Sequence, residues 1–166
     1  MKKRLTLLRH AKSSWNNPSL DDRDRPLNKR GERDAPMMGQ RLLKKSTRPS
    51  LILTSPAKRA RQTARLIARE IGYPIEFLQT EPDLYLAAPG DMLDVIAQQD
   101  NAFNDIVLCG HNPGITELTN RLSGRAIDNV PTCGMVFLEA DITGWDELGQ
   151  ARCTLQEFDY PKANQD

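Results

Sequence analysis

The sequence predicts an α/β domain of three layers, in which a mostly parallel central sheet is flanked by helices. Short apolar runs alternate along the chain with segments of helical periodicity, which is typical of parallel strands connected by helices. The length of 166 residues and a hydrophobic content of 39% suit one domain with a substantial core. We expect this single domain to span residues 1–160 and the tail 161–166 to fray.

Six segments are predicted to form strands. The first, residues 3–8, is an apolar run followed by polar residues, which favours a buried strand. Two further segments near the end of the chain are compatible with a hairpin. The remaining predicted strands are 51–54, 75–78, 105–109, 133–139 and 151–158.

Four segments are predicted to form helices. The clearest is 57–71, where alanine and isoleucine recur at helical spacing and Gly72 can end the helix. Residues 29–45 also have an apolar side, but Pro36 predicts a late start or a kink there. The other two predicted helices are 90–98 and 114–122.

Residues 11–28 are predicted to form a long loop, because they combine several aspartates with Asn16, Asn17 and Pro18. Loops of this length within a compact domain are usually functional or mobile. Trp15 makes this loop a candidate wall of a binding site, although a place in the core is equally compatible with a tryptophan.

Composition excludes several classes of protein. The formal net charge of +1 requires no nucleic-acid or membrane partner, and the basic clusters at 2–4 and 23–33 are expected to be solvated faces. No apolar run approaches the ~20 residues of a membrane span, and no signal peptide is expected. Three scattered cysteines fit a reducing compartment, so we expect a cytoplasmic protein.

The chain contains only two histidines, and each lies just past a short apolar run. His10 follows Arg9 at the end of the first run, and His111 lies in the sequence Gly110-His111-Asn112 after the run 105–109. In α/β proteins ligands gather outside the carboxyl ends of the strands. Two imidazoles at such ends, one beside an arginine, predict an anion site whose chemistry needs a nucleophile.

Phosphoryl transfer suits these residue types. A phosphoryl group in transfer spreads negative charge over its oxygens, and arginine binds two oxygens at once while staying charged. Arg9 and Arg59 would form this clamp. His10 must be neutral to attack, which an ordinary histidine pKa near ~6.5 permits. His111, if protonated, would add positive charge, and the amide of Asn112 would add a donor.

Three segments in order resemble the motifs of the histidine phosphatase superfamily. Leu8–Ser13 resembles its first signature, usually Arg-His-Gly, with Ala11 in place of the glycine. Thr54–Ala64 resembles the second arginine motif, and Gly110–Asn112 resembles the second histidine motif. Arg-His alone occurs by chance, whereas three matches in order are a strong signal.

This resemblance implies a phosphoglycerate-mutase-like fold, a phosphohistidine intermediate, and no metal or other cofactor. It implies a pocket of two arginines and two histidines: Arg9, His10, Arg59 and His111. The family often places extra phosphate contacts near Asn16, so Asn16 joins Asn112 as a predicted phosphate ligand. The short length and the stretch Asp24–Gly31 resemble the small protein-phosphohistidine phosphatases of the SixA type.

The general acid of ester-cleaving relatives is absent from its usual place. Tyr85 aligns with that acid in Glu81-Pro82-Asp83-Leu84-Tyr85, and Asp21, Asp22, Asp24, Glu81 and Asp83 remain possible substitutes. An alkoxide leaving group benefits strongly from a positioned acid. A phosphorylated imidazole can instead take its proton from water, because imidazole titrates near pH ~6.5.

The sequence therefore predicts a metal-independent phosphatase acting on phosphohistidine in a protein, with His10 as nucleophile. A phosphohistidine-bearing protein is the expected partner, and a monomer is favoured. Two alternatives stay open: a small-molecule phosphomonoesterase of the same superfamily, and a non-catalytic phosphoprotein-binding module. A zinc site is not expected, because two histidines lack a recognisably spaced third ligand.

Overall fold

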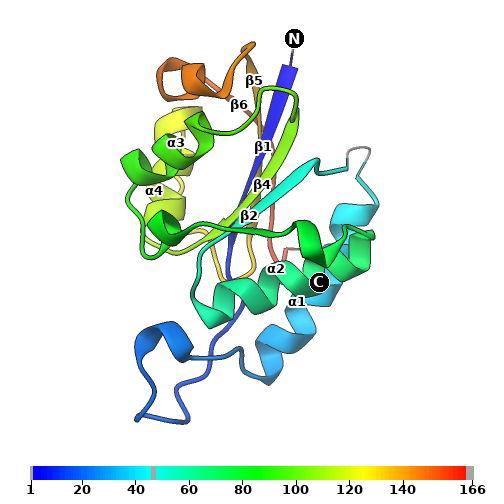
Figure 1. Ribbon diagram of the computed structural model, residues 1–166, viewed down its shortest axis with the longest axis vertical. Helices are drawn as coiled ribbons and strands as arrows, with labels where there is room; N and C mark the ends of the chain where they lie inside the picture. The colour runs from blue at the N-terminus through cyan, green and yellow to red at the C-terminus, as the bar shows by residue number, and fades with distance from the viewer. Residues whose placement is uncertain (1, 46–47, 164–166) are drawn as a thin grey trace.

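The computed structural model describes residues 2–45 and 48–163, and it contains the predicted α/β architecture. Six strands form one mixed sheet in the order β3-β2-β4-β1-β5-β6 (Figure 1). The four strands from β3 to β1 run parallel, and β5 and β6 pair antiparallel at one side. The strand bounds are β1 Lys2–Arg9, β2 Leu51–Thr54, β3 Gln79–Thr80, β4 Asp105–Gly110, β5 Met135–Asp141 and β6 Thr154–Asp159.

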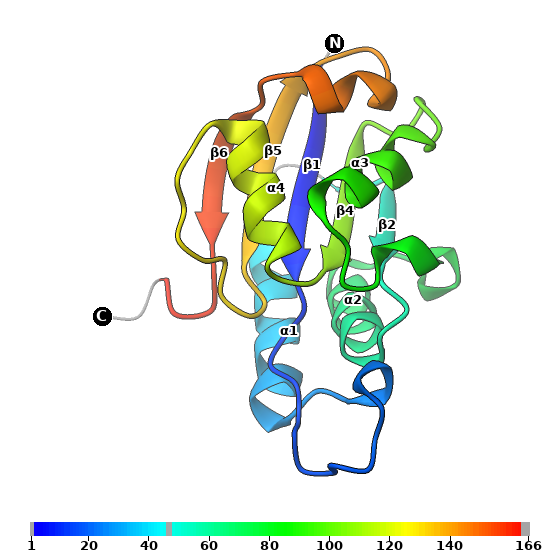
Figure 2. The same cartoon turned by 90° about the vertical axis from the view of Figure 1, so that its left-hand side faces the viewer.

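Helices cover both faces of the sheet, which gives the three predicted layers. Figures 1 and 2 show α1 and α2 on one face and α3 and α4 on the other. The buried apolar residues divide accordingly into two clusters, one for each face. The bounds are α1 Lys29–Leu43, α2 Lys58–Ile71, α3 Pro89–Ala97 and α4 Gly114–Ser123.

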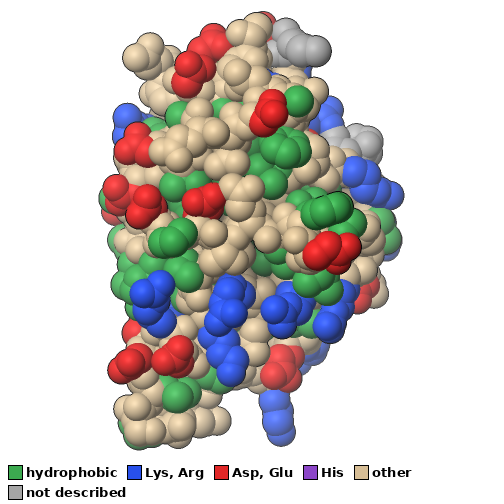
Figure 3. Space-filling view, viewed as in Figure 1, with side chains coloured by type: hydrophobic (Ala, Val, Ile, Leu, Met, Phe, Trp, Pro, Cys, Tyr) green, Lys and Arg blue, Asp and Glu red, His purple; other side chains and the backbone are tan. Residues whose placement is uncertain are grey.

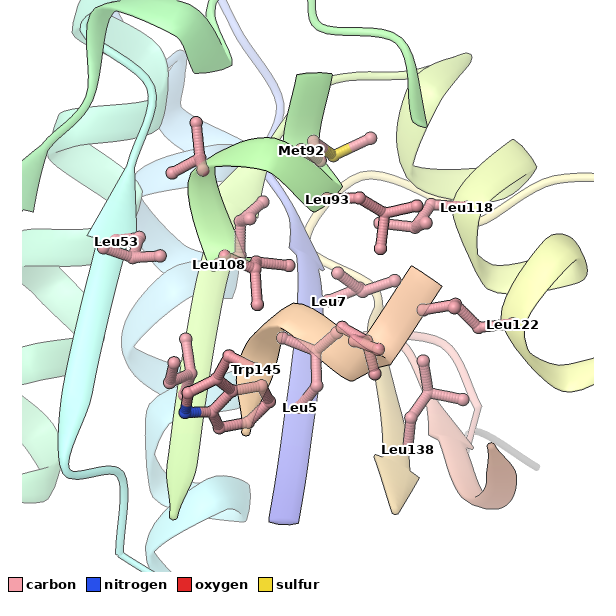
Figure 4. Packing of buried hydrophobic residues seen from close by; sticks show 14 of the residues in the cluster. Leu5, Leu7, Leu53, Met92, Leu93, Leu108, Leu118, Leu122, Leu138 and Trp145 are labelled. Atoms are coloured by element: carbon pink, nitrogen blue, oxygen red, sulfur yellow. The ribbon is translucent and has the colours of Figure 1, made fainter. Parts of the chain in front are cut away.

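The cluster under α3 and α4 follows from the alternation of side chains along a strand. Leu5 and Leu7 of β1 point to this face and contact a layer that includes Leu108 and Trp145 (Figure 4). Leu8 points to the opposite face and joins the cluster under α1 and α2. Burial on both faces is typical of central parallel strands, which therefore hold their ends in fixed positions.

Helix α1 begins at Lys29 and passes through Pro36, so the predicted late start is wrong. Asn28 caps the helix, since its side-chain oxygen accepts a hydrogen bond from Gly31 N at 2.9 Å. Close packing on α2 supports the helix past the proline: a Cβ at Gly39 would lie 2.8 Å from Glu70 Cβ. Tertiary contacts here override the local propensity.

The predicted strand 75–78 is also wrong. Residues Ile75–Phe77 form a short 3₁₀ helix, and the two-residue strand β3 follows it. A short apolar run does not by itself distinguish a strand from another buried segment. In this case Phe77 is 64% exposed, so the run is not a buried strand.

The ends of the chain complete the description. The predicted frayed tail lies partly outside the described residues, which end at Ala163. Within the described part of the chain, the structure contains no helix that is both long and apolar enough to span a membrane.

Candidate active site

The two histidines meet because their strands are neighbours in the sheet. Strands β1 and β4 pair in parallel, with Arg9 opposite Gly110, so the residues that follow both strands emerge at one edge. The rings of His10 and His111 have centroids 5.2 Å apart. Both side chains are buried, and neither histidine is visible on the face in Figure 3.

The tautomer of His10 is fixed by the backbone. Its Nδ1 lies 2.7 Å from the carbonyl oxygen of Ala11, which can only accept a hydrogen bond. Nδ1 therefore carries the proton, and the Nε2 lone pair is directed toward Arg59, whose Nε lies 3.4 Å away. This is the arrangement that a nucleophilic imidazole requires.

Arg59 enters the site from the first turn of α2, directly after β2. It is buried, and its Nη2 lies 3.5 Å from Nδ1 of His111. Thr63, one turn later, donates to the Arg59 carbonyl at 2.8 Å and accepts from Ala11 N at 2.9 Å. Thr63 thus ties α2 to the backbone beside His10.

Arg9 reaches the same edge from the end of β1. Its Nη1 donates to the carbonyl of Val130 at 3.0 Å, while its Nε is buried without a hydrogen-bond partner among the described residues. Burial lowers the pKa of Arg9. A buried unpaired donor is costly, and an anion bound in the pocket would satisfy it.

His111 is held between a hydroxyl and a guanidinium. Its Nε2 lies 2.7 Å from Ser55 Oγ, on the residue that follows β2. Since Arg59 can only donate, its Nη2 favours the tautomer in which Nδ1 of His111 accepts and Nε2 donates to Ser55. Ser55 is therefore a site residue that the sequence pattern did not reveal.

The surroundings of both imidazoles favour their neutral forms. Burial, aided by the nearby arginines, lowers the pKa of His10 to about 4, although the hydrogen bond to Ala11 opposes the shift. Burial, together with His10 and Arg59, lowers the pKa of His111 to about 3. The protonated His111 considered from the sequence is therefore not its state before an anion binds.

The residues around His10 line a cavity of about 190 Å³ that opens to solvent. We call it the histidine pocket. Asn112 lines it, although its side-chain amide already donates to Asn129 Oδ1 at 2.9 Å and to the Val130 carbonyl at 3.0 Å. The structure does not bring Asn16 to the pocket, because Asn16 is exposed on the loop. The lining residues are Arg9, His10, Lys12, Ser13, Trp15, Arg25, Arg59, Leu86, His111, Asn112 and Thr132.

Arg25 corrects the expectation that all of 23–33 is a solvated basic face. Its side chain is buried in the pocket wall, where Nε donates to the Ser14 carbonyl at 3.1 Å. Its guanidinium carbon lies 3.3 Å from the centre of the Trp15 ring, a stacked cation–π contact. The stretch Asp24–Gly31, which supported the resemblance, was the one sequence signal for this residue.

Asp22 and Tyr85 form the side of the site next to Arg59. Asp22 Oδ2 accepts from Arg59 Nη2 at 2.9 Å and from the Tyr85 hydroxyl at 2.5 Å. Partial burial would raise the pKa of Asp22, but hydrogen bonds from Tyr85, Arg59 and Arg25 hold it well below its usual range. The Tyr85 ring meets that of His111 edge to face, with centroids 5.7 Å apart.

None of the sequence-derived acids lines the histidine pocket, and among the described residues Asp22 is the one that pairs with its arginines. Asp21, Asp24, Glu81 and Asp83 lie elsewhere. The loop that carries Asp22 has closely paired ends. Ser13 and Leu27 form an antiparallel bridge, and Asn28 N donates to the Lys12 carbonyl at 3.0 Å. The loop therefore projects from a fixed stem beside His10.

Metal ligands and cysteines complete the inventory of reactive side chains. Within 2–45 and 48–163, no group of three or more His, Cys, Asp or Glu side chains is arranged to hold a metal ion. Cys109, Cys133 and Cys153 are free and buried, and burial raises the pKa of Cys109 to about 12. Such a thiol is not a nucleophile at neutral pH.

Comparisons with known proteins agree with this geometry. An uncharacterized chloroplastic protein of Arabidopsis thaliana is 36% identical over 153 residues, covering 87% of this chain and 70% of that protein. A structure of the protein assigned as the phosphohistidine phosphatase SixA of Agrobacterium tumefaciens has a TM-score of 0.82 and 29% identity, covering 96% of this chain and 98% of that one.

The corresponding structure from Nakamurella multipartitia, at 24% identity, has a TM-score of 0.86 and covers 98% of each chain, which shows the same fold. A sequence model of the histidine phosphatase superfamily (branch 1) matches residues 5–84, which contain the first histidine and both clamp arginines. The chain belongs to the histidine phosphatase superfamily.

Proposed function

We propose that this protein is a metal-independent phosphatase that removes the phosphoryl group from phosphohistidine in another protein. One observation carries the proposal: the unprotonated Nε2 of His10 faces a pocket lined by Arg9, Arg25 and Arg59. The arginines supply the positive charge that a transferring phosphoryl group requires, and the buried neutral imidazole supplies the nucleophile.

The reaction proceeds in two steps. Nε2 of His10 forms a bond to phosphorus as the P–N bond of the substrate breaks, and the released imidazole takes a proton from water. Water then attacks phosphorus, the bond to His10 breaks, and inorganic phosphate and neutral His10 result. The phosphoryl dianion favours a protonated imidazole nearby, so His111 gains proton affinity only when the pocket is filled.

The side of the pocket where an acid is expected supports cleavage of a P–N bond. Asp22 stays ionised. The pKa of Tyr85 is raised by partial burial and by the hydrogen bond that Tyr85 donates to Asp22. Neither group readily donates a proton at neutral pH. An ester needs a proton from such an acid for its leaving alkoxide, whereas the leaving imidazole can take its proton from water.

The rim of the pocket favours a protein substrate. The cavity of about 190 Å³ is open and smaller than the ~300–1,000 Å³ of typical small-molecule sites, which favours a substrate whose bulk lies outside it. Two large apolar side chains stand at this rim: Trp15 is 72% exposed and Leu86 is 56% exposed. Exposed apolar side chains around a charged centre are typical of a protein contact.

The proposal includes a cytoplasmic location and a monomer. The three free cysteines suit a reducing compartment. The phosphohistidine-bearing partner would present its side chain to the pocket of one copy of the chain.

The proposal is tested by phosphate release from a phosphohistidine-carrying protein and from an aryl phosphate, with a chelator present. We expect the wild type to release phosphate from the phosphoprotein faster, and His10→Ala to lose about 10⁴-fold in rate. A control variant, Glu32→Gln on the exposed start of α1, should keep the wild-type rate.

Each other outcome has a clear meaning. Faster turnover of the aryl phosphate would identify a phosphomonoesterase. Phosphoprotein binding with no release by the wild type would identify a binding module. Release that survives both His10→Ala and the chelator would remove His10 from the mechanism.

A further inference from the structure

The carboxylate of Asp22 accepts hydrogen bonds from the same arginines that the phosphoryl group would bind. Its Oδ2 accepts from Arg59 Nη2 at 2.9 Å, and its Oδ1 accepts from Arg25 Nη1 at 2.9 Å. The Asp22 carbonyl oxygen also accepts from Arg59 Nη1 at 2.7 Å. Both terminal nitrogens of Arg59 are therefore engaged by this one residue in the free protein.

Asp22 resembles a bound anion in its contacts. A carboxylate bridging two guanidinium groups presents two oxygens to them, as a phosphoryl group does. The Tyr85 hydroxyl completes the arrangement by donating to Oδ2 from the other side at 2.5 Å. Tyr85 thus anchors Asp22 against the arginines.

The two partners differ in how freely they move. The side chain of Arg59 is 4% exposed, whereas that of Asp22 is 42% exposed. Asp22 also begins a three-residue 3₁₀ turn within the loop 11–28, while Arg59 lies in the packed helix α2. When an anion enters, Asp22 is the group that can turn outward, and Arg59 stays in place.

We propose that Asp22 is a built-in competitor for the arginines that lowers the affinity of the pocket for phosphate and so releases inorganic phosphate after each turnover. This inference rests on the proposed function, because release matters only if phosphate is formed there. No covalent bond is made or broken in the exchange. One anion leaves the guanidinium groups and another takes its place, and like charges next to each other oppose simultaneous occupancy.

The competition is measured directly by titration calorimetry with inorganic phosphate as the probe. We expect Asp22→Asn to bind phosphate about tenfold more tightly than the wild type, because a negative charge is removed while the side-chain shape is kept. The matched control is Asp24→Asn, which removes the same charge from an exposed position on the same turn. It should bind phosphate as the wild type does.

Tyr85→Phe provides an independent variant, since it removes only the hydroxyl that anchors Asp22. We expect phosphate affinity to rise about threefold, in the same direction as for Asp22→Asn. In turnover, Asp22→Asn should show a lower kcat and stronger inhibition by phosphate. A purely structural role for Asp22 predicts the opposite, since a displaced Arg59 would weaken phosphate binding.

The inference is overturned if folded Asp22→Asn and Tyr85→Phe bind phosphate with unchanged or weaker affinity. Binding is measured without turnover, so its result is independent of the substrate. A protein that fails to hydrolyse phosphohistidine yet shows tighter phosphate binding in Asp22→Asn would refute the proposed function and leave the competition established. The reverse pattern would refute only the competition.

Discussion

The active site has two halves that the fold supports differently. One half, the strand-end half, lies at the ends of buried parallel strands and in the first turn of α2 after β2, and it includes Arg9, His10, Arg59 and His111. The other half comes from the loop 11–28 and includes Asp22 and Arg25. In the proposed mechanism the strand ends hold the groups that react with phosphorus, while the loop holds the groups that admit and release the anion. Rigid and adjustable parts are thus divided between different segments of the chain.

Matched arginine variants test this division with the largest expected effect. We expect Arg59→Met to lower kcat/KM for a phosphohistidine protein about 10³-fold, because Arg59 is next to the attacking Nε2 of His10. Arg25→Met should lower it only about tenfold, because Arg25 forms the wall of the pocket. Equal losses in steady-state kinetics would show that the loop half is as central as the strand-end half.

The next largest expected effect is the pH dependence of the two histidines. They are the only histidines in the chain, so NMR can follow each ring separately. In the folded protein their ring signals should titrate near the pKa values of about 4 and about 3, and near ~6.5 in urea. Since the folded pKa values lie below the unfolded ones, stability should fall as pH drops from ~6.5 toward these values. Activity should fall when His10 becomes protonated, near pH 4.

A ring that titrated near 6.5 in the folded protein would contradict the neutral buried state of the strand-end half. Added phosphate provides a further check on the same sample. A bound anion should raise the pKa of His111, because a negative charge nearby favours the protonated ring.

Trp15→Ala gives the smallest expected effect and concerns only the loop half. We expect KM for a phosphohistidine protein to rise about fivefold, because the exposed ring contacts the substrate outside the pocket. The rise in KM for a small phosphoramidate should be smaller. The measurement is the ratio of the KM increase for the protein to that for the phosphoramidate. Phe77→Ala removes another exposed aromatic that does not line the pocket, and it should leave the ratio unchanged.

The strand-end half could be predicted from the sequence because local patterns encode it. Apolar runs mark β1 and β4, and the residue after each run must lie at the carboxyl edge of the sheet. Arg59 follows from the helix that begins directly after β2. To predict that His10, His111 and Arg59 lie close together, one therefore needs only to know that their strands are neighbours in the sheet.

The loop half could not be predicted in the same way, because its contacts depend on how a long irregular segment folds back. Asp22 is 37 residues from Arg59 in sequence and 63 from Tyr85, and no periodicity links them. Asn16 shows the converse: a place in the right loop does not bring a side chain into the pocket. The 3₁₀ helix at Ile75–Phe77 was missed for a related reason, since a short segment that mixes apolar residues with Glu76 fits several structures.

The stem at the base of the loop has a consequence for how such enzymes diversify. Two contacts hold the ends of the loop together at its base. They are the bridge between Ser13 and Leu27 and the hydrogen bond from Asn28 N to the Lys12 carbonyl. Lengthening a surface loop costs little free energy once its ends are fixed. The segment between Ser14 and Pro26 can therefore be replaced as a unit without moving His10. In this scaffold an exchanged loop would change both the specificity and the release of the anion, while His10 keeps its place after β1.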